Sequence, residues 1–564
     1  SIDSCVCLGF QNTHNYQFPF VCNDFVYKHE YSISATNNTN YYYQWENFIN
    51  YNKTFADVHD LGAMVGMSWE SSHSDNVRGS ATGIDILKGY AENFRYLSYL
   101  KDGDGVNKSM SNDVNDSKNL SYFGRLTYSY DNRYSLQANF RADAFDSSKL
   151  GKDNRWGKFP SFSAGWTVSN ESFFADNVST EVVSFLKLRA SWGRNGNINV
   201  LENYPYAAVI NQNNDFYQFT SDFKQSYGSQ TNGLPNPSLE WEESEQIDLG
   251  LDARFLNSRL TLGLDWYKKT TKGLLVSVTP VLETGVKSTM SNAGEVENMG
   301  LEVELGWKDK VGDFSYSINA NLATLHNELT YLDPTVDKIA GTSLQGSSIT
   351  TECVVGKPLW HFLGYQFDSF DDEGIAQFKD IDGNGKFEPN ASDMTDLGCG
   401  LPKLTYGITI NMEYKGFDFT LFGTGVSGNK IVPQAWRTDR PYCNNYSWFY
   451  ENAWNPETKS GDFPVISADG WTKQAFSSDL TVFSGAYFKI KQIQLGYTLP
   501  KELLSKAYIN SMRVFASLEN FITISKYPGL DPESASANTT KSLGIDMGTY
   551  PTAKQVIFGV NLTF

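Results

Sequence analysis

The last nine residues of the chain, Val556-Ile-Phe-Gly-Val-Asn-Leu-Thr-Phe564, place an apolar side chain at every second position. Successive side chains of a β-strand point to opposite faces of the sheet, so this alternation predicts a strand with one fully apolar face. The stretch also ends on an aromatic residue.

The same pattern recurs along most of the sequence. Four apolar residues alternate from Leu260 to Trp266 and again from Leu301 to Trp307, and five alternate from Tyr406 to Tyr414. The predicted strands, counted back from the last residue, are 553–564, 510–524, 484–498, 416–425, 403–414, 312–328, 295–308, 258–270, 243–256, 184–195, 158–169, 133–146, 119–131, 55–71, 40–52 and 24–33. The sequence thus predicts sixteen strands of similar design.

The length of these strands separates them from those of soluble proteins. Many run to about 10 to 14 residues, whereas strands in soluble sheets cluster near five or six. Tyr406 and Tyr414 stand eight residues apart, which at a tilt near 40° corresponds to roughly 20 Å of height. This height is close to that of the apolar band of an outer-membrane barrel, so the two rings are expected at its two water interfaces.

The connections between the predicted strands alternate in length. With the last residue in the periplasm, the periplasmic connections are 51–54, 131–133, 169–183, 256–258, 307–313, 415–416 and 499–509. The extracellular ones are 72–118, 196–242, 271–294, 329–402, 425–483 and 525–552. Outer-membrane barrels have short periplasmic turns and long extracellular loops, while a soluble β-sandwich or propeller has no reason to follow this rule. We predict an all-β chain that forms a transmembrane antiparallel β-barrel.

Composition excludes other classes. The 46 Lys and Arg residues against 64 Asp and Glu give a net charge of −18, which argues against a nucleic-acid binder. Mean hydropathy is −0.40, and no run approaches the roughly 18 to 20 apolar residues of a membrane-spanning helix. Six scattered cysteines predict isolated thiols with at most one incidental bridge: Cys5, Cys7, Cys22, Cys353, Cys399 and Cys443.

Several stretches carry more specific motifs, in a fixed order along the chain. They are Gly124–Tyr134, Arg155–Trp166, Leu186–Gly196, Pro237–Trp241, Asn298–Glu302, Tyr487–Pro500 and the terminal strand. Together they resemble the SusC/RagA-type TonB-dependent outer-membrane transporters of Bacteroidetes. The resemblance extends from about Tyr51 to Phe564 and is weaker over residues 1–50.

The resemblance implies a longer protein. In this family a signal peptide, a small extension domain, a TonB-contact segment and a plug domain precede a barrel of 22 strands. None of these is recognisable here, so residues 1–50 are expected to hold the first strands and loop present, and residues 51–564 the C-terminal part of the barrel. The alternative is that sixteen strands close alone, as in porins.

The resemblance also implies a function. Its members import nutrients across the outer membrane of a Gram-negative bacterium, usually oligosaccharides and sometimes oligopeptides. A SusD-like surface lipoprotein closes over the mouth of the channel, and TonB supplies the energy. The competing hypothesis is a secreted or surface β-rich glycan-binding protein.

An acidic loop is the sharpest local motif. The run Asp380-Ile-Asp382-Gly-Asn384-Gly-Lys386 has the oxygen ligands, the backbone carbonyl at Lys386 and the glycine spacing of an EF-hand-type calcium loop. Its twelfth position is Ala391, so the bidentate carboxylate is missing unless Asp393 or Asp396 replaces it through a bulge. The motif predicts a Ca²⁺ site. The alternative is an acidic turn without metal, and no cofactor is required.

Aromatic residues gather in the predicted extracellular loops. Flat rings stack on sugars or anchor partners, and the candidates for substrate binding are Trp360, Tyr446, Trp448 and Trp454. The alternative is that these rings pack the loops onto themselves.

Motifs of catalysis are missing from the sequence. There is no HExxH, HxH, GxSxG or P-loop, and the acidic run from Glu240 to Glu245 is typical of a solvated strand entrance. We therefore predict that the protein is not an enzyme.

Overall fold

The computed structural model describes most of the chain. The described residues are 3–17, 31–83, 107–146, 148–201, 204–207, 210–218, 225–231, 234–278, 289–344, 346–434, 446–504, 509–535 and 540–564. The α-helices among them have four or five residues each: α1 (Ser172–Ala175), α2 (Ser447–Glu451), α3 (Lys501–Leu504) and α4 (Pro532–Ala535). No helix in the described ranges is long and apolar enough to cross a bilayer.

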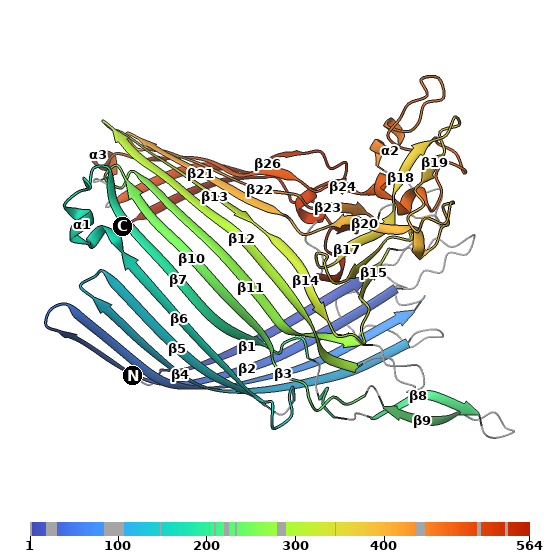
Figure 1. The fold of residues 1–564 in the computed structure, drawn as a ribbon, viewed down its shortest axis with the longest axis horizontal. Helices are drawn as coiled ribbons and strands as arrows, with labels where there is room; N and C mark the ends of the chain where they lie inside the picture. Colours follow the sequence, from blue (N-terminus) through green and yellow to red (C-terminus); the bar gives the residue numbers. More distant parts are fainter. Residues whose placement is uncertain are drawn as a thin grey trace.

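One large antiparallel sheet dominates the fold (Figure 1). Its strands are β1 (Asp3–Gln17), β2 (Tyr31–Phe55), β3 (His59–Gly83), β4 (Asn107–Tyr130), β5 (Tyr134–Phe145), β6 (Trp156–Thr167), β7 (Val183–Asn197), β10 (Glu242–Phe255), β11 (Leu260–Val278), β12 (Thr289–Val311), β13 (Phe314–Thr324), β14 (His326–Leu332), β21 (Leu404–Tyr414), β22 (Phe417–Ser427), β25 (Tyr487–Thr498), β26 (Ser511–Ser525) and β28 (Gln555–Thr563).

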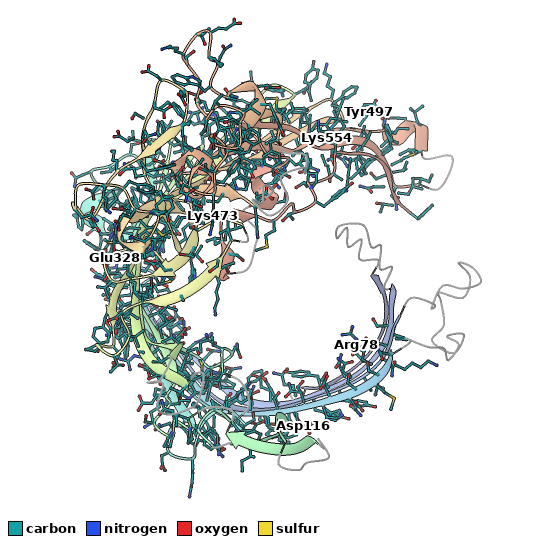
Figure 2. All side chains as sticks on the ribbon, turned by 90° about the vertical axis from the view of Figure 1, so that its right-hand side faces the viewer. Arg78, Asp116, Glu328, Lys473, Tyr497 and Lys554 are labelled. Carbon is teal, nitrogen blue, oxygen red and sulfur yellow. The ribbon has the colours of Figure 1, made fainter. Side chains whose placement is uncertain are left out.

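The sheet is a meander, in which each strand pairs with the next one along the chain. β13 and β14 both pair with β12 and are separated only by Leu325, so the seventeen segments amount to sixteen strands in the described residues. This agrees with the predicted number and confirms the all-β barrel architecture. Figure 2, seen from the long-loop end, shows the sheet as an arc, and in the described residues no ladder joins β1 to β28.

The short strands gather at one end of the large sheet. The long loops carry four small sheets, formed by β8 (Ile210–Gln218) with β9 (Gln225–Thr231), by β15 (Ile339–Ser343), β16 (Thr350–Cys353), β17 (His361–Tyr365) and β20 (Met394–Cys399), by β18 (Phe367–Phe370) with β19 (Ala376–Phe378), and by β23 (Lys430–Pro433), β24 (Phe483–Ser484) and β27 (Ile545–Asp546). These lie at the right in Figure 1, while α1, α3 and both chain ends lie at the left. The predicted alternation of short turns and long loops is confirmed.

Tight turns close the hairpins at the short-turn end. Ala56 and Asp57 between β2 and β3, and Asp131 and Asn132 between β4 and β5, all have positive φ. Two consecutive residues of positive φ are the signature of the turn whose twist matches the flanking strands. The β2–β3 turn lies a few residues later than predicted, because the ladder continues to Phe55 opposite His59.

The two faces of the sheet differ as the alternation predicted. Apolar side chains of the outward rows are exposed, for example Phe558 at 79%, Leu249 at 50% and Leu136 at 53%. The inward rows are polar: on β5, Asn139 accepts a hydrogen bond from Arg125 Nε at 3.0 Å and donates one to Ser161 Oγ at 3.0 Å. The aliphatic rows therefore do not interlock in a core; they form the bilayer-facing wall of a transmembrane barrel.

The buried apolar residues lie mainly beneath the loops. One cluster lies where strands β5 to β12 meet the long loops. It consists of Leu150, Ile198, Leu201, Leu239 and Leu275. Another, centred on Phe449, Phe463 and Phe476, fills the loop between β22 and β25. These clusters hold the long loops in fixed positions over the mouth of the barrel.

Two features of the N-terminal half differ from the prediction. β3 and β4 continue to Gly83 and back to Asn107, far beyond the predicted 55–71 and 119–131, because the Ser-, Asn- and Asp-rich extensions pair with each other without any apolar alternation. The first strand is β1 at 3–17, paired with β2. The strand predicted at 24–33 overlaps the start of β2, and its residues 24–30 lie outside the described residues.

Candidate functional site

A cavity of about 730 Å³ opens on the inward face of β3 to β7, at the end of the barrel that carries the long loops. We call it the mouth cavity. It is lined by inward-row residues and by the segment that precedes β10, including Glu70, Asn119, Arg141, Asp143, Asn195 and Trp241.

Two aromatic rings form one side of the mouth cavity. The rings of Phe159 and Trp241 meet edge to face with centroids 5.5 Å apart. A Cβ on Gly157 or on Gly196 would overlap the Phe159 ring, so these two glycines allow the ring to lie flat against the wall. Trp241 is half-buried, and its Nε1 donates to the carbonyl of Arg155 at 3.2 Å. The pair is therefore a rigid aromatic surface.

Amide and hydroxyl groups surround the aromatic pair. Arg141 is already engaged, since its Nε donates to Asp143 Oδ1 at 2.7 Å and its Nη2 to Ser121 Oγ at 2.8 Å. Asn195 is exposed, and Asn119 Oδ1 is enclosed with no hydrogen-bond partner in the described part of the chain. The wall thus offers an exposed amide at Asn195 and an unpaired amide oxygen at Asn119, beside an arginine that is already engaged.

Tyr446 and Trp448, two of the predicted aromatic candidates, lie in the loop between β22 and β25. The Tyr446 hydroxyl donates to Asp546 Oδ2 at 3.2 Å, and burial, followed by the charge of Asp546, raises the pKa of Tyr446 to about 12. Trp448 packs edge to face against Phe449 at 5.3 Å and Phe483 at 4.9 Å. Both rings stabilise the loop, and their contact with a substrate stays a prediction.

The other two aromatic candidates lie in different loops. Trp360 has a positive φ of 56°, packs against the cluster around Leu329, and donates its backbone N–H to Cys353 Sγ at 3.3 Å. Trp454 packs on Phe370 at 5.2 Å, and its Nε1 is enclosed without a partner among the described residues. The four candidates therefore do not form one site; only Tyr446 and Trp448 belong to a common cluster.

The acidic loop brings three carboxylates together. Oxygens of Asp380, Asp382 and Asp393 all lie within 4.8 Å of one another, so Asp393 joins the cluster as the predicted bulge requires. Asp396 does not join, because it pairs with Lys357 at 3.1 Å. Asn384 Oδ1 accepts a hydrogen bond from the backbone N–H of Lys386 at 3.1 Å. Lys386 is the residue whose backbone carbonyl the motif predicts as a ligand. These oxygens are the type that Ca²⁺ prefers.

Hydrogen bonds also stabilise the acidic loop from within. The buried Asp393 accepts backbone N–H groups of Ile381 at 2.9 Å and Glu388 at 2.5 Å, and these bonds lower the pKa of Asp393, the Glu388 contribution being the largest. Asp380 accepts from Gly385 at 2.6 Å and Gly383 at 2.7 Å, which lowers its pKa likewise. Since such a turn can form without a cation, calcium binding stays a prediction.

An ion-pair network that the sequence analysis did not find fixes the last long loop. Lys489 of β25, which is 2% exposed, contacts Asp531 at 2.9 Å and Glu533 at 2.8 Å. Thr552 donates to Asp531 from its hydroxyl at 2.7 Å and from its backbone at 3.0 Å. The two closely spaced lysines of β25, Lys489 and Lys491, were the available signal. The network holds the segments around Asp531 and Thr552 against the barrel wall.

Two of the six cysteines have side chains that the structure describes. Cys353 and Cys399 are free and buried, and burial raises the pKa of the Cys353 thiol to about 11. The side chains of the other cysteines lie outside the described residues. Neither described thiol is placed to act on a solute in the mouth cavity.

The chain is similar to known proteins over most of its length. The family model described as TonB dependent receptor-like, beta-barrel matches residues 8–520. The TonB-dependent receptor SusC of Bacteroides thetaiotaomicron is 31% identical over 514 residues, which cover 86% of this chain and 48% of that protein. The TonB-dependent receptor P3 of Formosa agariphila is 28% identical over 551 residues, covering 92% of this chain and 52% of that protein. The chain thus spans about half the length of the curated relatives it matches.

Among solved structures, the RagAB peptide importer in its open-open state superposes with a TM-score of 0.81 at 22% identity. The match covers 100% of this chain and 59% of that chain. At 22% identity, this similarity is evidence for a shared fold alone.

Proposed function

Because the chain belongs to the TonB dependent receptor-like β-barrel family, we propose that it imports oligomeric nutrients across the outer membrane of a Gram-negative bacterium. The cargo is an oligosaccharide or an oligopeptide. The chain acts as the channel subunit beneath a SusD-like surface lipoprotein, and TonB supplies the energy.

The observation that carries this proposal is the opposite character of the two faces of one continuous sheet. The outward rows are apolar and exposed, while the inward rows hold arginine, asparagine, serine and carboxylates, which line a mouth cavity beneath long loops. A wall of this kind suits a polar passage through lipid. The exposed aliphatic rows also favour a transporter over a secreted glycan-binding protein, whose strands would bury them.

The family supports the other parts of the proposal. SusC and P3 are named TonB-dependent receptors, and a structural relative is named a peptide importer. Since the outer membrane holds no ATP, work must reach the barrel by mechanical contact, which is the role proposed for TonB. No catalytic role is proposed.

Uptake in the native host tests this function. The gene for the full-length protein is deleted, and cells are supplied with fluorescently labelled oligosaccharides and oligopeptides as well as with free monosaccharides and amino acids. We expect loss of uptake of one class of oligomer, with normal use of the monomers and restoration by the intact gene. A strain without TonB activity and a strain without the lipoprotein should lose the same oligomer. Unchanged uptake of every oligomer in the deletion strain contradicts the proposal.

We further propose that Asp380, Asp382 and Asp393, with Asn384 and the carbonyl of Lys386, hold Ca²⁺ outside the cell. The support is the convergence of three carboxylates within 4.8 Å. Extracellular calcium is plentiful, so even a weak site of this kind fills. The loop aromatics Trp360, Tyr446, Trp448 and Trp454 remain the proposed substrate contacts.

A further inference from the structure

We propose that the outward wall of β4 to β6 binds a phosphorylated glycolipid of the outer leaflet, with a phosphate on Lys152 and Lys158 and an acyl chain in a groove below them. Lipid A, the membrane anchor of lipopolysaccharide, has this chemistry. The proposal goes beyond the import of a cargo, and it rests on the proposed function only in placing the long loops outside the cell.

Two pairs of stacked rings mark the membrane interfaces on this wall. Trp156 of β6 stacks on Tyr122 of β4 with centroids 6.0 Å apart, and Trp166 of β6 stacks on Tyr134 of β5 at 6.5 Å. Trp and Tyr gather at both water interfaces of membrane proteins. The two tryptophans stand ten residues apart, which at a tilt of roughly 40° is about 25 Å of height. Because the Trp156 end carries the long loops, that pair lies at the outer leaflet.

A groove of about 690 Å³ lies in the outward wall, on the membrane side of the Trp156–Tyr122 pair. We call it the outer groove. The apolar outward residues around it are Val65, Tyr122, Leu126, Phe140, Pro160 and Phe162. Gly124 and Ala138 also line it, and their small size leaves the wall hollow. Pro160 is four residues from Trp156 and six from Trp166, so the groove belongs to the outer half of the wall and suits an acyl chain there.

Three cations at the upper end of the outer groove make no ion pair within the described residues. Lys158 is exposed on the outward row of β6 and lies opposite Ala142, which lies opposite Tyr122. Lys152 is exposed in the connection between β5 and β6, and Arg155 Nε is enclosed without a hydrogen-bond partner. A lysine on a lipid-facing row extends its ammonium group towards the headgroups. Lys158 therefore presents its charge at the interface that the connection borders.

The connection between β5 and β6 is short and positively charged. Leu150 anchors it in the buried cluster beneath the loops. Over residues 146–158, four cations stand against two acids. One of these acids, Asp146, accepts backbone N–H groups of Lys118 and Ser148 at 2.8 Å each. In a chain with a net charge of −18, this is a local excess of positive charge close to the membrane.

Three other cations in the loop-end half of the outward rows are already neutralised. The pairs are Arg194–Glu243 at 3.1 Å, Lys272–Glu245 at 3.2 Å and Lys268–Glu297 at 2.7 Å. Lys152 and Lys158 differ in having no such acid, so they are available to an external anion. A phosphate is the anion that lysine and arginine bind well, and lipid A supplies it at this depth.

A second copy of the barrel is the alternative occupant of the outer groove. A two-fold axis through the groove would bring two sets of these unpaired cations together, which is unfavourable. The charge therefore favours an anionic lipid over a second copy.

Native mass spectrometry of the purified full-length protein in detergent tests the proposal. The probe is hexaacylated lipid A with both phosphates, and the comparison lipids are the same lipid A without phosphates and phosphatidylethanolamine. We expect the phosphorylated probe to bind at least about tenfold more tightly than either comparison lipid. Millimolar inorganic phosphate should not displace it, because the acyl chain also contributes to binding.

Variants locate the site. The double substitution Lys152→Gln and Lys158→Gln should weaken binding of phosphorylated lipid A by about tenfold. Lys272→Gln is the matched control, since Lys272 is paired with Glu245, and it should change the affinity by less than about twofold. Ala138→Leu fills the outer groove with an apolar side chain and should weaken binding about threefold. Heat-modifiable gel mobility checks that each variant is folded.

Each contrary outcome overturns a defined part of the proposal. Equal binding with and without phosphates, or unchanged binding in the double lysine variant, excludes the cation site. Displacement by inorganic phosphate, or unchanged binding in Ala138→Leu, excludes the acyl chain from the outer groove. If the variants shift the protein between monomer and dimer and leave lipid A binding unchanged, a second copy is the occupant. None of these results bears on import, which fails only if uptake in the deletion strain is unchanged.

Discussion

Arg513 on β26 binds Asp418 on β22 across the whole width of β25, with Nε and Oδ1 2.8 Å apart. Gly496 of β25 lies beneath the bond, and a Cβ there would stand 2.5 Å from both Arg513 Nη2 and Asp418 Oδ1. Arg189 reaches Asp265 at 2.9 Å over Gly250 in the same way. Glycines of the inward rows therefore allow charged side chains to join strands that are not neighbours.

Gly496→Ala should separate this ion pair. The new methyl group occupies the space of the bond, so the guanidinium and the carboxylate must move apart into the lumen, and we expect a loss of about 1 to 2 kcal/mol of unfolding free energy. Urea unfolding of the barrel in lipid vesicles measures this loss.

Gly263→Ala is the control for that experiment. Gly263 is also on an inward row, but a Cβ there would meet only Glu304 at 3.5 Å, an ordinary contact. Its unfolding free energy should remain within about 0.5 kcal/mol of the wild type. Equal losses for the two glycine variants would refute the role given to Gly496.

The carboxylate of Asp531 should make stability depend on acid pH. Burial alone would raise its pKa, but hydrogen bonds from Thr552 and the contact with Lys489 outweigh this and lower it to about 2. A carboxylate with a lowered folded-state pKa contributes stability above its unfolded-state pKa near 4, and the contribution is lost as the pH falls towards 2. From this difference in pKa we expect a contribution of about 2 kcal/mol at neutral pH.

Asp531→Asn tests this dependence. We expect the variant to be about 2 kcal/mol less stable than the wild type at pH 7 and the difference to shrink between pH 4 and pH 2. Unfolding curves of both proteins across this range provide the measurement, and limited proteolysis should show earlier cleavage within residues 526–554 of the variant. A stability difference that is independent of pH would contradict the account.

The reach of sequence reasoning follows from the range of the interactions involved. The alternation from Leu260 to Trp266 is local, so the strand and its outward face could be predicted without neighbours. The acidic loop from Asp380 to Asp393 is nearly as local, and its sequence left Asp393 and Asp396 as alternatives for the last carboxylate. By contrast, Trp241 meets Phe159 from a site 82 positions later, and Lys489 meets Asp531 across a loop; no local period encodes such contacts.

The acidic loop should bind calcium through Asp393. After treatment with a chelator, titration of the full-length protein with Ca²⁺ should give a Kd on the order of 10⁻⁴ to 10⁻³ M, the range of extracellular sites. Asp393→Asn removes one carboxylate charge from the cluster and should weaken binding about tenfold or more. Asp396→Asn is the matched control, because Asp396 pairs with Lys357 outside the cluster and should leave the Kd unchanged. Identical titrations for the wild type and Asp393→Asn would exclude this site.

A charged side chain in the middle of the outward row should impair folding of the barrel into a membrane. Leu249 lies near the centre of β10, is 50% exposed, and stands between Ala190 and Trp266 on the bilayer-facing side. Leu249→Arg places a guanidinium in hydrocarbon at a cost of about 2 to 4 kcal/mol, so folding into vesicles should fall accordingly. Gln246→Arg, three residues away on the inward row, puts the same charge into the aqueous lumen and should fold normally by heat-modifiable gel mobility. If the two variants fold equally well, the outward rows do not face lipid, and the arrangement of the two faces on which import depends is wrong.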